Sequence, residues 1–160
     1  MSIPGSNHPP QKTFDRLADR RSLEGQVLGT SAWTLVDQRR IDLFADATAD
    51  HPWIHVDRER AAAGPFGKTI AHGFLTLSLI PEFFASAFDV ADSRMGVNYG
   101  LNRVRFTAPV PVDSRLRGHF KLLKFEPLEG GAQLTVEVTI EMEGAAKPVC
   151  VAESLTRRFV

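Results

Sequence analysis

The chain has almost no cysteine, no excess of charge of either sign and no uninterrupted long apolar run. Its single cysteine, Cys150, excludes an internal disulfide framework and indicates a reducing compartment. The apolar neighbours Val149 and Val151 favour a packed thiol over a reactive one. Nineteen basic residues balance nineteen acidic ones, so no electrostatic argument favours nucleic acid or an anionic membrane surface as a partner.

The longest apolar segment, residues 73–88, is interrupted by Pro81 and Glu82 and is too short to span a bilayer comfortably. Residues 1–10 lack the basic start and apolar run of a signal peptide, so we expect a cytoplasmic protein without a membrane partner. Residues 1–13 are rich in Pro, Ser, Asn and Gly and predict a flexible N-terminal arm. Residues 14–160 are enough for a single domain with its own core.

The first half of the chain predicts short helices and one extended segment. Residues 26–35 are rich in β-favouring side chains, and residues 15–24 suggest a short helix or an irregular strap. Asp37 is a plausible N-cap for a helix that ends near Asp50, because Pro52 disfavours helical geometry in the preceding residue. Its apolar positions recur at helical spacing: Ile41, Phe44, Ala45 and Thr48. Residues 57–63 predict a second short helix.

Residues 73–88 are apolar around most of a helical circumference, which predicts a helix buried on nearly all sides. Pro81 predicts a kink or break after Leu77. Everything downstream indicates β-strands, over residues 98–106, 115–125, 134–142 and 149–160, and residues 134–142 alternate strictly between apolar and polar. This order predicts an α+β fold in which a strongly curved antiparallel sheet wraps around a long central helix.

The candidate chemistry lies in two short segments. Asp50 and His55 stand five positions apart in a segment rich in apolar side chains, and His72-Gly73 opens the apolar helix. A carboxylate and an imidazole move protons, while a backbone N–H at a helix start, here that of Gly73, stabilises an oxyanion. Trp53 would bury the loop between the acid and the base. This set suits chemistry at a carbonyl carbon skeleton.

Each of these side chains also has a simpler interpretation. An Asp and a His at this spacing are more often a helix cap and a surface histidine. His51 and Asp57 extend the pair to a possible metal cluster, but a single loop rarely supplies a whole site, so we expect no metal. The side chain of His72 has the alternative role of fixing the turn before the helix.

Further candidates lie on the helix and on the strand that follows it. Ser78 either contacts the site or bonds back to its own helix as a core hydroxyl. Phe74 belongs either to the core or to an acyl tunnel. Asn98, Tyr99 and Arg103 form a sheet edge with dimer contacts in the simpler interpretation. In the alternative, Arg103 meets the phosphates of a CoA or carrier arm.

In their order and spacing, three segments resemble the MaoC-like dehydratase family, the (R)-specific enoyl-CoA hydratases of the hot-dog fold. Within the family they are most similar to the branch that includes the NodN-like proteins. The segments are residues 44–55, which read FADATADHPWIH, residues 70–79, which read IAHGFLTLSL, and residues 97–111, which read VNYGLNRVRFTAPVP.

The resemblance implies reversible hydration of a trans-2-enoyl thioester, on CoA or acyl-carrier protein, to the (R)-3-hydroxyacyl thioester. It implies that Asp50 and His55 hold the water, that the Gly73 N–H binds the thioester oxygen, and that Ser78 lies near the acid/base pair. It further implies a homodimer without a metal or redox cofactor. Many relatives have Asn where Pro52 stands. A hot-dog thioesterase and a non-catalytic acyl-thioester-binding subunit remain alternatives, and the base and acid are unassigned between Asp50 and His55.

Overall fold

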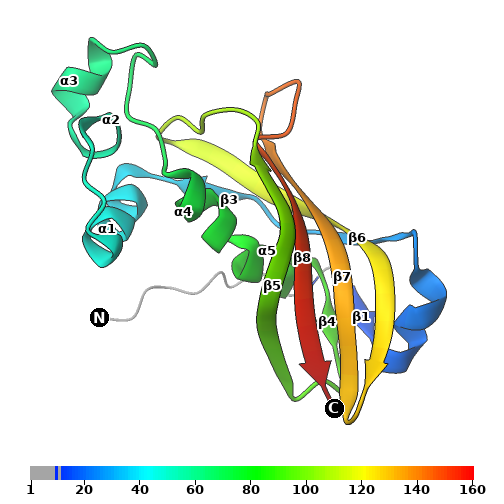
Figure 1. Cartoon of the computed structure of the whole chain (residues 1–160). Coiled ribbons are helices and arrows are strands. Elements are labelled where there is room, and N and C mark those ends of the chain that lie inside the picture. The colour runs from blue at the N-terminus through cyan, green and yellow to red at the C-terminus, as the bar shows by residue number, and fades with distance from the viewer. Residues whose placement is uncertain (1–9, 11) are drawn as a thin grey trace.

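The structure is a computed structural model that describes residue 10 and residues 12–160. Its main sheet is antiparallel, with strand order β2-β6-β7-β8-β5, and β3 pairs with β6 as well. The strands are β2 (Val27–Thr30), β3 (Thr34–Val36), β5 (Met95–Phe106), β6 (Ser114–Leu128), β7 (Gly131–Met142) and β8 (Cys150–Phe159). The sheet curves past the helices, as Figure 1 shows. The predicted α+β architecture is confirmed.

The core fills the concave side of this sheet. The apolar positions of β7 that alternate in the sequence, Val136, Val138 and Ile140, are fully buried. They pack in one cluster with Phe83 of the central helix. Cys150 belongs to the same cluster and is also fully buried, and burial raises the pKa of its thiol to about 11. The interpretation of Cys150 as a packing residue therefore agrees with its place in the core.

The central helix is two helices, α4 (Gly73–Ser78) and α5 (Ile80–Ala87), with a break at Leu79. Pro81 lies in the first turn of α5, where its missing N–H costs no helical hydrogen bond. The predicted break is confirmed. The prediction of burial on nearly all sides is wrong for one stripe: Phe74 is 70% exposed and Ser78 is exposed too. The stripe lies beside β5, the edge strand, and no described strand pairs with the outer side of β5.

Three helices precede the central pair and lie together to one side of it in Figure 1. They are α1 (Gln38–Thr48), α2 (Trp53–Val56) and α3 (Arg58–Ala62). The Asp37 side chain accepts from the Arg40 N–H at 2.9 Å, which confirms the predicted N-cap. α1 ends as expected, with Ala49 in the left-handed conformation at φ 55° and Asp50 following it. α3 confirms the second predicted helix, whereas α2 was expected to be a loop.

The chain's first elements pack beside the end of α5. β1 (Thr13–Phe14) pairs in parallel with β4 (Asp89–Val90), and the 3-10 helix η1 (Leu17–Leu23) follows it. The predicted arm, residues 1–13, lies outside the described residues except for residues 10, 12 and 13. Of these, Thr13 belongs to β1. Among the described residues, no helix combines the length and the apolar character that crossing a membrane requires.

Candidate active site

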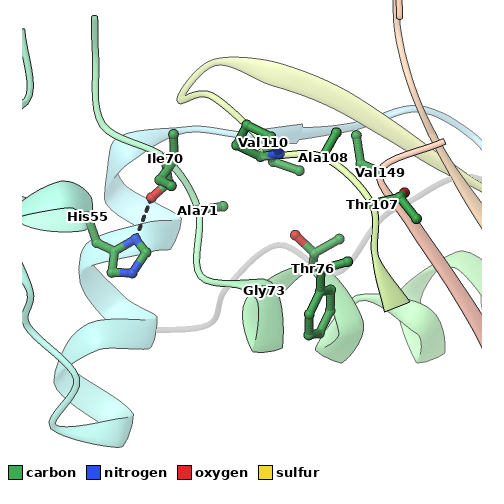
Figure 2. A pocket seen from close by; sticks show the side chains of 11 residues that line it. His55, Ile70, Ala71, Gly73, Thr76, Thr107, Ala108, Val110 and Val149 are labelled. Carbon is green, nitrogen blue, oxygen red and sulfur yellow. Dashed lines mark hydrogen bonds between the residues drawn. The ribbon is translucent and has the colours of Figure 1, made fainter. Parts of the chain in front are cut away.

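His55 is carried by α2, the short helix that the sequence did not predict. Pro52 occupies its N-cap with φ −59°, a value that suits the entry to a helix, and its carbonyl accepts from the His55 N–H at 3.0 Å. The imidazole is 9% exposed, and its Nδ1 lies 2.7 Å from the Ile70 carbonyl (Figure 2). Because a carbonyl only accepts, Nδ1 carries the hydrogen. In the neutral ring, Nε2 therefore keeps its lone pair for a ligand.

His72 joins the two halves of the predicted site. Its ring stacks on that of His55, with centroids 3.8 Å apart and planes 24° from parallel. Its Nε2 donates to the Asp50 backbone carbonyl at 2.9 Å. His72 is 3% exposed, and its Nδ1 finds no partner among the described residues. The side chain thus holds the Asp50 segment against the base, which goes beyond fixing the turn.

Asp50 presents its carboxylate at the end of α1. Oδ2 lies 3.9 Å from His72 Nε2, and the side chain is 51% exposed. The sequence had led us to expect a pair shielded from solvent. His55 fulfils that expectation and Asp50 does not, because its loop runs along the rim of the chain. Burial is the largest influence on the pKa of His55 and lowers it; His72 lowers it too, while the Ile70 carbonyl and the Asp50 charge raise it.

Gly73 and His55 line one cavity of about 400 Å³. In Figure 2, Gly73 opens α4 opposite His55, with the Ile70–Ala71 segment between them. The Gly73 N–H makes no hydrogen bond to another described residue. A Cβ at this position would come 3.0 Å from the Phe106 ring, so the ring's packing demands a glycine here. The donor predicted from the sequence is therefore free and faces the same space as the base.

A second cavity of about 510 Å³ lies along the open stripe of α4 and α5. It brings together four of the predicted residues: Phe74, Ser78, Asn98 and Tyr99. The Ser78 hydroxyl donates to the Leu75 carbonyl at 2.8 Å, so it bonds back to its own helix and still lines the cavity.

Four predicted residues line neither cavity: Asp50 and His72, which are described above, and Trp53 and Arg103. Trp53 packs against Gly64 and lies beneath the Arg60 guanidinium, 4.6 Å from the ring centroid. Arg103 is exposed on β5 opposite Glu153. The two cavities around α4 thus bring together His55, Gly73, Phe74, Ser78, Asn98 and Tyr99. Asp50 is linked to His55 only through His72, and Trp53 and Arg103 lie apart.

Two supporting residues were missed from the sequence. Gln38, 5% exposed at the start of α1, donates through Nε2 to the His55 carbonyl at 2.8 Å. Its Oε1 accepts from the Thr69 hydroxyl, so one amide ties α1 to α2 and to the segment before Gly73. The signal was present, since Gln38 precedes Ile41 and Ala45 on the buried face of α1 at helical spacing.

The four residues of the possible metal cluster have other partners. His51 contacts Asp46 through Nε2 at 2.9 Å, and the Asp57 side chain caps α3 by accepting from the Arg60 N–H. Among the residues that the structure describes, no three His, Cys, Asp or Glu side chains form a group suited to a metal ion.

An antiparallel sheet that curves past a central helix is the architecture of the hot-dog fold. The chain belongs to the MaoC-like domain family, whose model matches residues 20–145. It is 53% identical over 147 residues to 3-hydroxyacyl-thioester dehydratase Z of Mycobacterium tuberculosis, covering 91% of this chain and 97% of that protein. It is also 51% identical over 144 residues to nodulation protein N of Rhizobium leguminosarum, covering 88% of this chain and 89% of that protein.

Solved structures share the fold at lower identity. The (R)-hydratase PhaJ1 of Pseudomonas aeruginosa superposes with a TM-score of 0.66 at 24% identity, covering 84% of this chain and 81% of that one. The (R)-hydratase of A. caviae superposes with a TM-score of 0.63 at 18% identity, covering 82% of this chain and 95% of that one. These likenesses establish the hot-dog fold.

Proposed function

We propose that the protein is a hydro-lyase that adds water to a trans-2-enoyl thioester to give the (R)-3-hydroxyacyl thioester, and catalyses the reverse dehydration. One observation supports this proposal: His55 and Gly73 line a single cavity, and neither the His55 Nε2 nor the Gly73 N–H bonds to another described residue. Addition of water to an enoyl thioester requires a base at Cβ and a donor at the thioester oxygen. The cavity supplies both.

The hydrogen bond of His55 to Ile70 supports a division of roles between His55 and Asp50, which the sequence left open. Since Nδ1–H is committed to the Ile70 carbonyl, the Nε2 lone pair takes the proton from water as its oxygen attacks Cβ. The enolate oxygen accepts from the Gly73 N–H. The Asp50 carboxylate stabilises the imidazolium that forms and orients the water, and the proton returns to Cα as the enolate collapses. The addition of water neither oxidises nor reduces the substrate, so it requires no redox cofactor, and in this proposal His55 and Gly73 activate the reactants without a metal.

The second cavity suits the acyl chain. Its lining is mainly apolar and includes Phe74, Leu77 and Leu101, and Phe74 directly follows the proposed donor Gly73. An acyl chain leaving the thioester carbon would bury its methylenes there. We propose that Phe74, Ser78, Asn98 and Tyr99 contact the substrate in this way. Arg103 is exposed on β5, and we propose that it contacts the carrier arm of the substrate, on CoA or on acyl-carrier protein.

We further propose that the active form is a cytoplasmic homodimer joined along β5. This strand is the unpaired edge of the sheet, and such an edge pairs readily with a second copy. Large apolar side chains are exposed along it: Met95, Val97, Leu101 and Phe106. The neighbouring Phe74 of α4 is the most exposed of the large apolar residues. A second copy would cover these side chains and enclose the open carboxylate of Asp50.

The test is hydration of crotonyl-CoA by the wild type and by Asp50→Asn and His55→Gln. Each variant should lose roughly 10²- to 10⁴-fold in kcat, the usual contribution of a positioned proton-transfer group. His51→Gln is the matched control, because His51 lies in the same segment but is exposed and contacts only Asp46. Near wild-type rates in both site variants would contradict the mechanism. Release of free CoA from butyryl-CoA would instead indicate a thioesterase.

A further inference from the structure

The inner face of β8 carries polar side chains where a packed core requires apolar ones. Along this face Ala152 is followed by Ser154, Thr156 and Arg158 at every second position. Ser154 is 5% exposed and Thr156 is 4% exposed, so both lie beneath the helices and away from solvent. An antiparallel strand normally turns its apolar side chains toward such a layer. This polar stripe, formed by Ser154, Thr156 and Arg158, therefore suggests a role in binding a ligand.

The stripe leads from the second cavity into a third one of about 410 Å³. Ser154 lines the second cavity, whereas Thr156 and Arg158 line the third, together with Phe84 and Phe88 of α5 and its C-cap. The second and third cavities share the lining residues Pro81 and Asn98, so they lie next to each other along α5. A chain that fills the second cavity from the Gly73 end points toward the third.

The polar groups of the third cavity lack partners within the described part of the chain. The Thr156 Oγ1 is buried and makes no hydrogen bond there. The Arg158 guanidinium makes no hydrogen bond or ion pair with another described residue, and burial lowers its pKa. Thr156 is buried and Arg158 is half-buried, so only the threonine hydroxyl is a buried polar group without a partner. A guanidinium and a hydroxyl that line one cavity suit a ligand with acceptor oxygens.

The backbone is shaped to hold this guanidinium inside. A Cβ at Gly96 of β5 would stand 2.7 Å from Arg158 Nη1, so glycine at this position leaves room for the guanidinium in its present place. On its other side the guanidinium is 6.0 Å from the Phe84 ring centroid. The half-buried arginine thus lies between strand and helix.

Asp89 and Arg20 complete the charges near this cavity. Asp89 lines it, but Asp89 is exposed and its carboxylate accepts no hydrogen bond from Arg158. Arg20 is fully buried nearby, where its Nη2 donates to the Asp89 carbonyl at 3.3 Å. Burial, and then the positive charge of Arg158, lower the pKa of Arg20 to about 10. The inner wall of the cavity is therefore cationic, and its one carboxylate lies on the solvent side.

We propose that Arg158 and Thr156 bind a carboxylate at the far end of an acyl chain, which makes thioesters of long dicarboxylic acids a substrate class of this site. The proposal rests on the proposed function, since it assumes that the thioester end lies at Gly73. A bidentate guanidinium with an adjacent hydroxyl is a common receptor for a carboxylate. The apolar second cavity would hold the methylenes between the two polar ends.

The distance along α4 and α5 determines how long an acyl chain must be to reach Arg158 from Gly73. Gly73 and Phe84 are 11 positions apart, which would be roughly 16 Å along one straight helix, and the break at Leu79 makes this an upper estimate of the span. A short acyl chain cannot reach Arg158, so crotonyl-CoA reports on the proposed hydration site without involving the far cavity.

The experiment measures binding by calorimetry with saturated acyl-CoAs, which cannot be hydrated, in pairs of equal chain length ending in a methyl group or a carboxylate. At the length that spans both cavities, the wild type should bind the carboxylate-ended ligand at least as tightly as the methyl-ended one. Arg158→Gln should weaken only the carboxylate-ended ligand, by roughly 10- to 100-fold, as expected for a buried charged hydrogen bond. Thr156→Val should weaken binding of the carboxylate-ended ligand several-fold. This near-isosteric change keeps the proposal testable if Arg158→Gln does not fold.

Arg117→Gln is the matched control, because Arg117 pairs with Glu141 on the other face of the sheet. Equal weakening of both ligands by Arg158→Gln would overturn the proposal and indicate contacts with CoA. Weak binding of carboxylate-ended ligands at every length would also overturn it. Crotonyl-CoA hydration, measured in parallel, keeps the two proposals separate, since its failure bears on the hydration site alone.

Discussion

Replacement of Gly73 by alanine tests the geometry at the start of α4 most sharply. The new Cβ would stand 3.0 to 3.1 Å from three atoms of the Phe106 ring, a few tenths of an ångström too close. Gly73 is not among the described residues with a positive φ, so alanine adopts its backbone conformation without strain. The backbone of Phe106 is fixed by its pairing with Cys150 across β5 and β8, whereas the residue is 44% exposed. The ring, or the Gly73 amide, must therefore move.

Overpacking of this kind costs roughly 1–3 kcal/mol, which for a chain of this size lowers Tm by about 2–4 °C per kcal/mol. Displacement of an oxyanion donor costs roughly 3 kcal/mol of transition-state stabilisation, or about 10²-fold in rate. Gly73→Ala should therefore lower kcat for crotonyl-CoA by about 10²-fold with a modest loss of Tm. Thermal unfolding and steady-state kinetics measure the two effects separately.

The double variant Gly73→Ala/Phe106→Leu provides the control, since leucine removes the ring atoms that the new Cβ would meet. Its stability should match that of Phe106→Leu alone, so the two changes should couple instead of adding. A Gly73→Ala protein with wild-type Tm and rate would refute the packing argument and the role of the amide together. Additive losses in the double variant would refute the packing argument alone.

Four further predictions concern protonation, stability and thiol reactivity. Because burial lowers the pKa of His55 below its usual 6.5, kcat/KM should be flat at neutral pH and fall in acid with an apparent pKa below 6.5. Because of the same shift, the unfolded state binds this proton at a higher pH than the folded state does. The free energy of unfolding should therefore decrease as the pH drops below about 6.5. Chemical denaturation of His55→Gln should lack that part of the decrease. Asp37→Ala removes the cap of α1 and should cost about 1 kcal/mol of unfolding free energy in urea titrations. Cys150, with its pKa raised to about 11, should react with a thiol reagent only after denaturation.

Local rules predicted most of the fold. The capped helix at Asp37, the break ahead of Pro81 and the alternation in β7 each depend on residues a few positions apart, and all three are present. The helix that carries His55 was missed because its four residues include a β-branched pair, and no periodic pattern is visible over so short a length.

The site was predicted in composition but not in geometry. The spacing of Asp50 and His55 suggested an acid/base pair, yet the contact that joins them comes from His72, which stacks on one and bonds to the other. Such a contact depends on how α4 packs against α2. The polar stripe of β8 escaped notice for a similar reason: strand alternation places Thr156 and Arg158 on one face, but only the packed sheet shows that this face is inside.

The most direct test of the central claim is the product that the wild-type protein forms from crotonyl-CoA and water. If Nε2 of His55 delivers water while the Gly73 N–H holds the thioester oxygen, the enone absorbance should decay. The product should then be (R)-3-hydroxybutyryl-CoA with the thioester intact, as chiral chromatography and mass spectrometry would show. Release of free CoA, formation of the (S)-alcohol, or tight binding without any turnover would contradict the account.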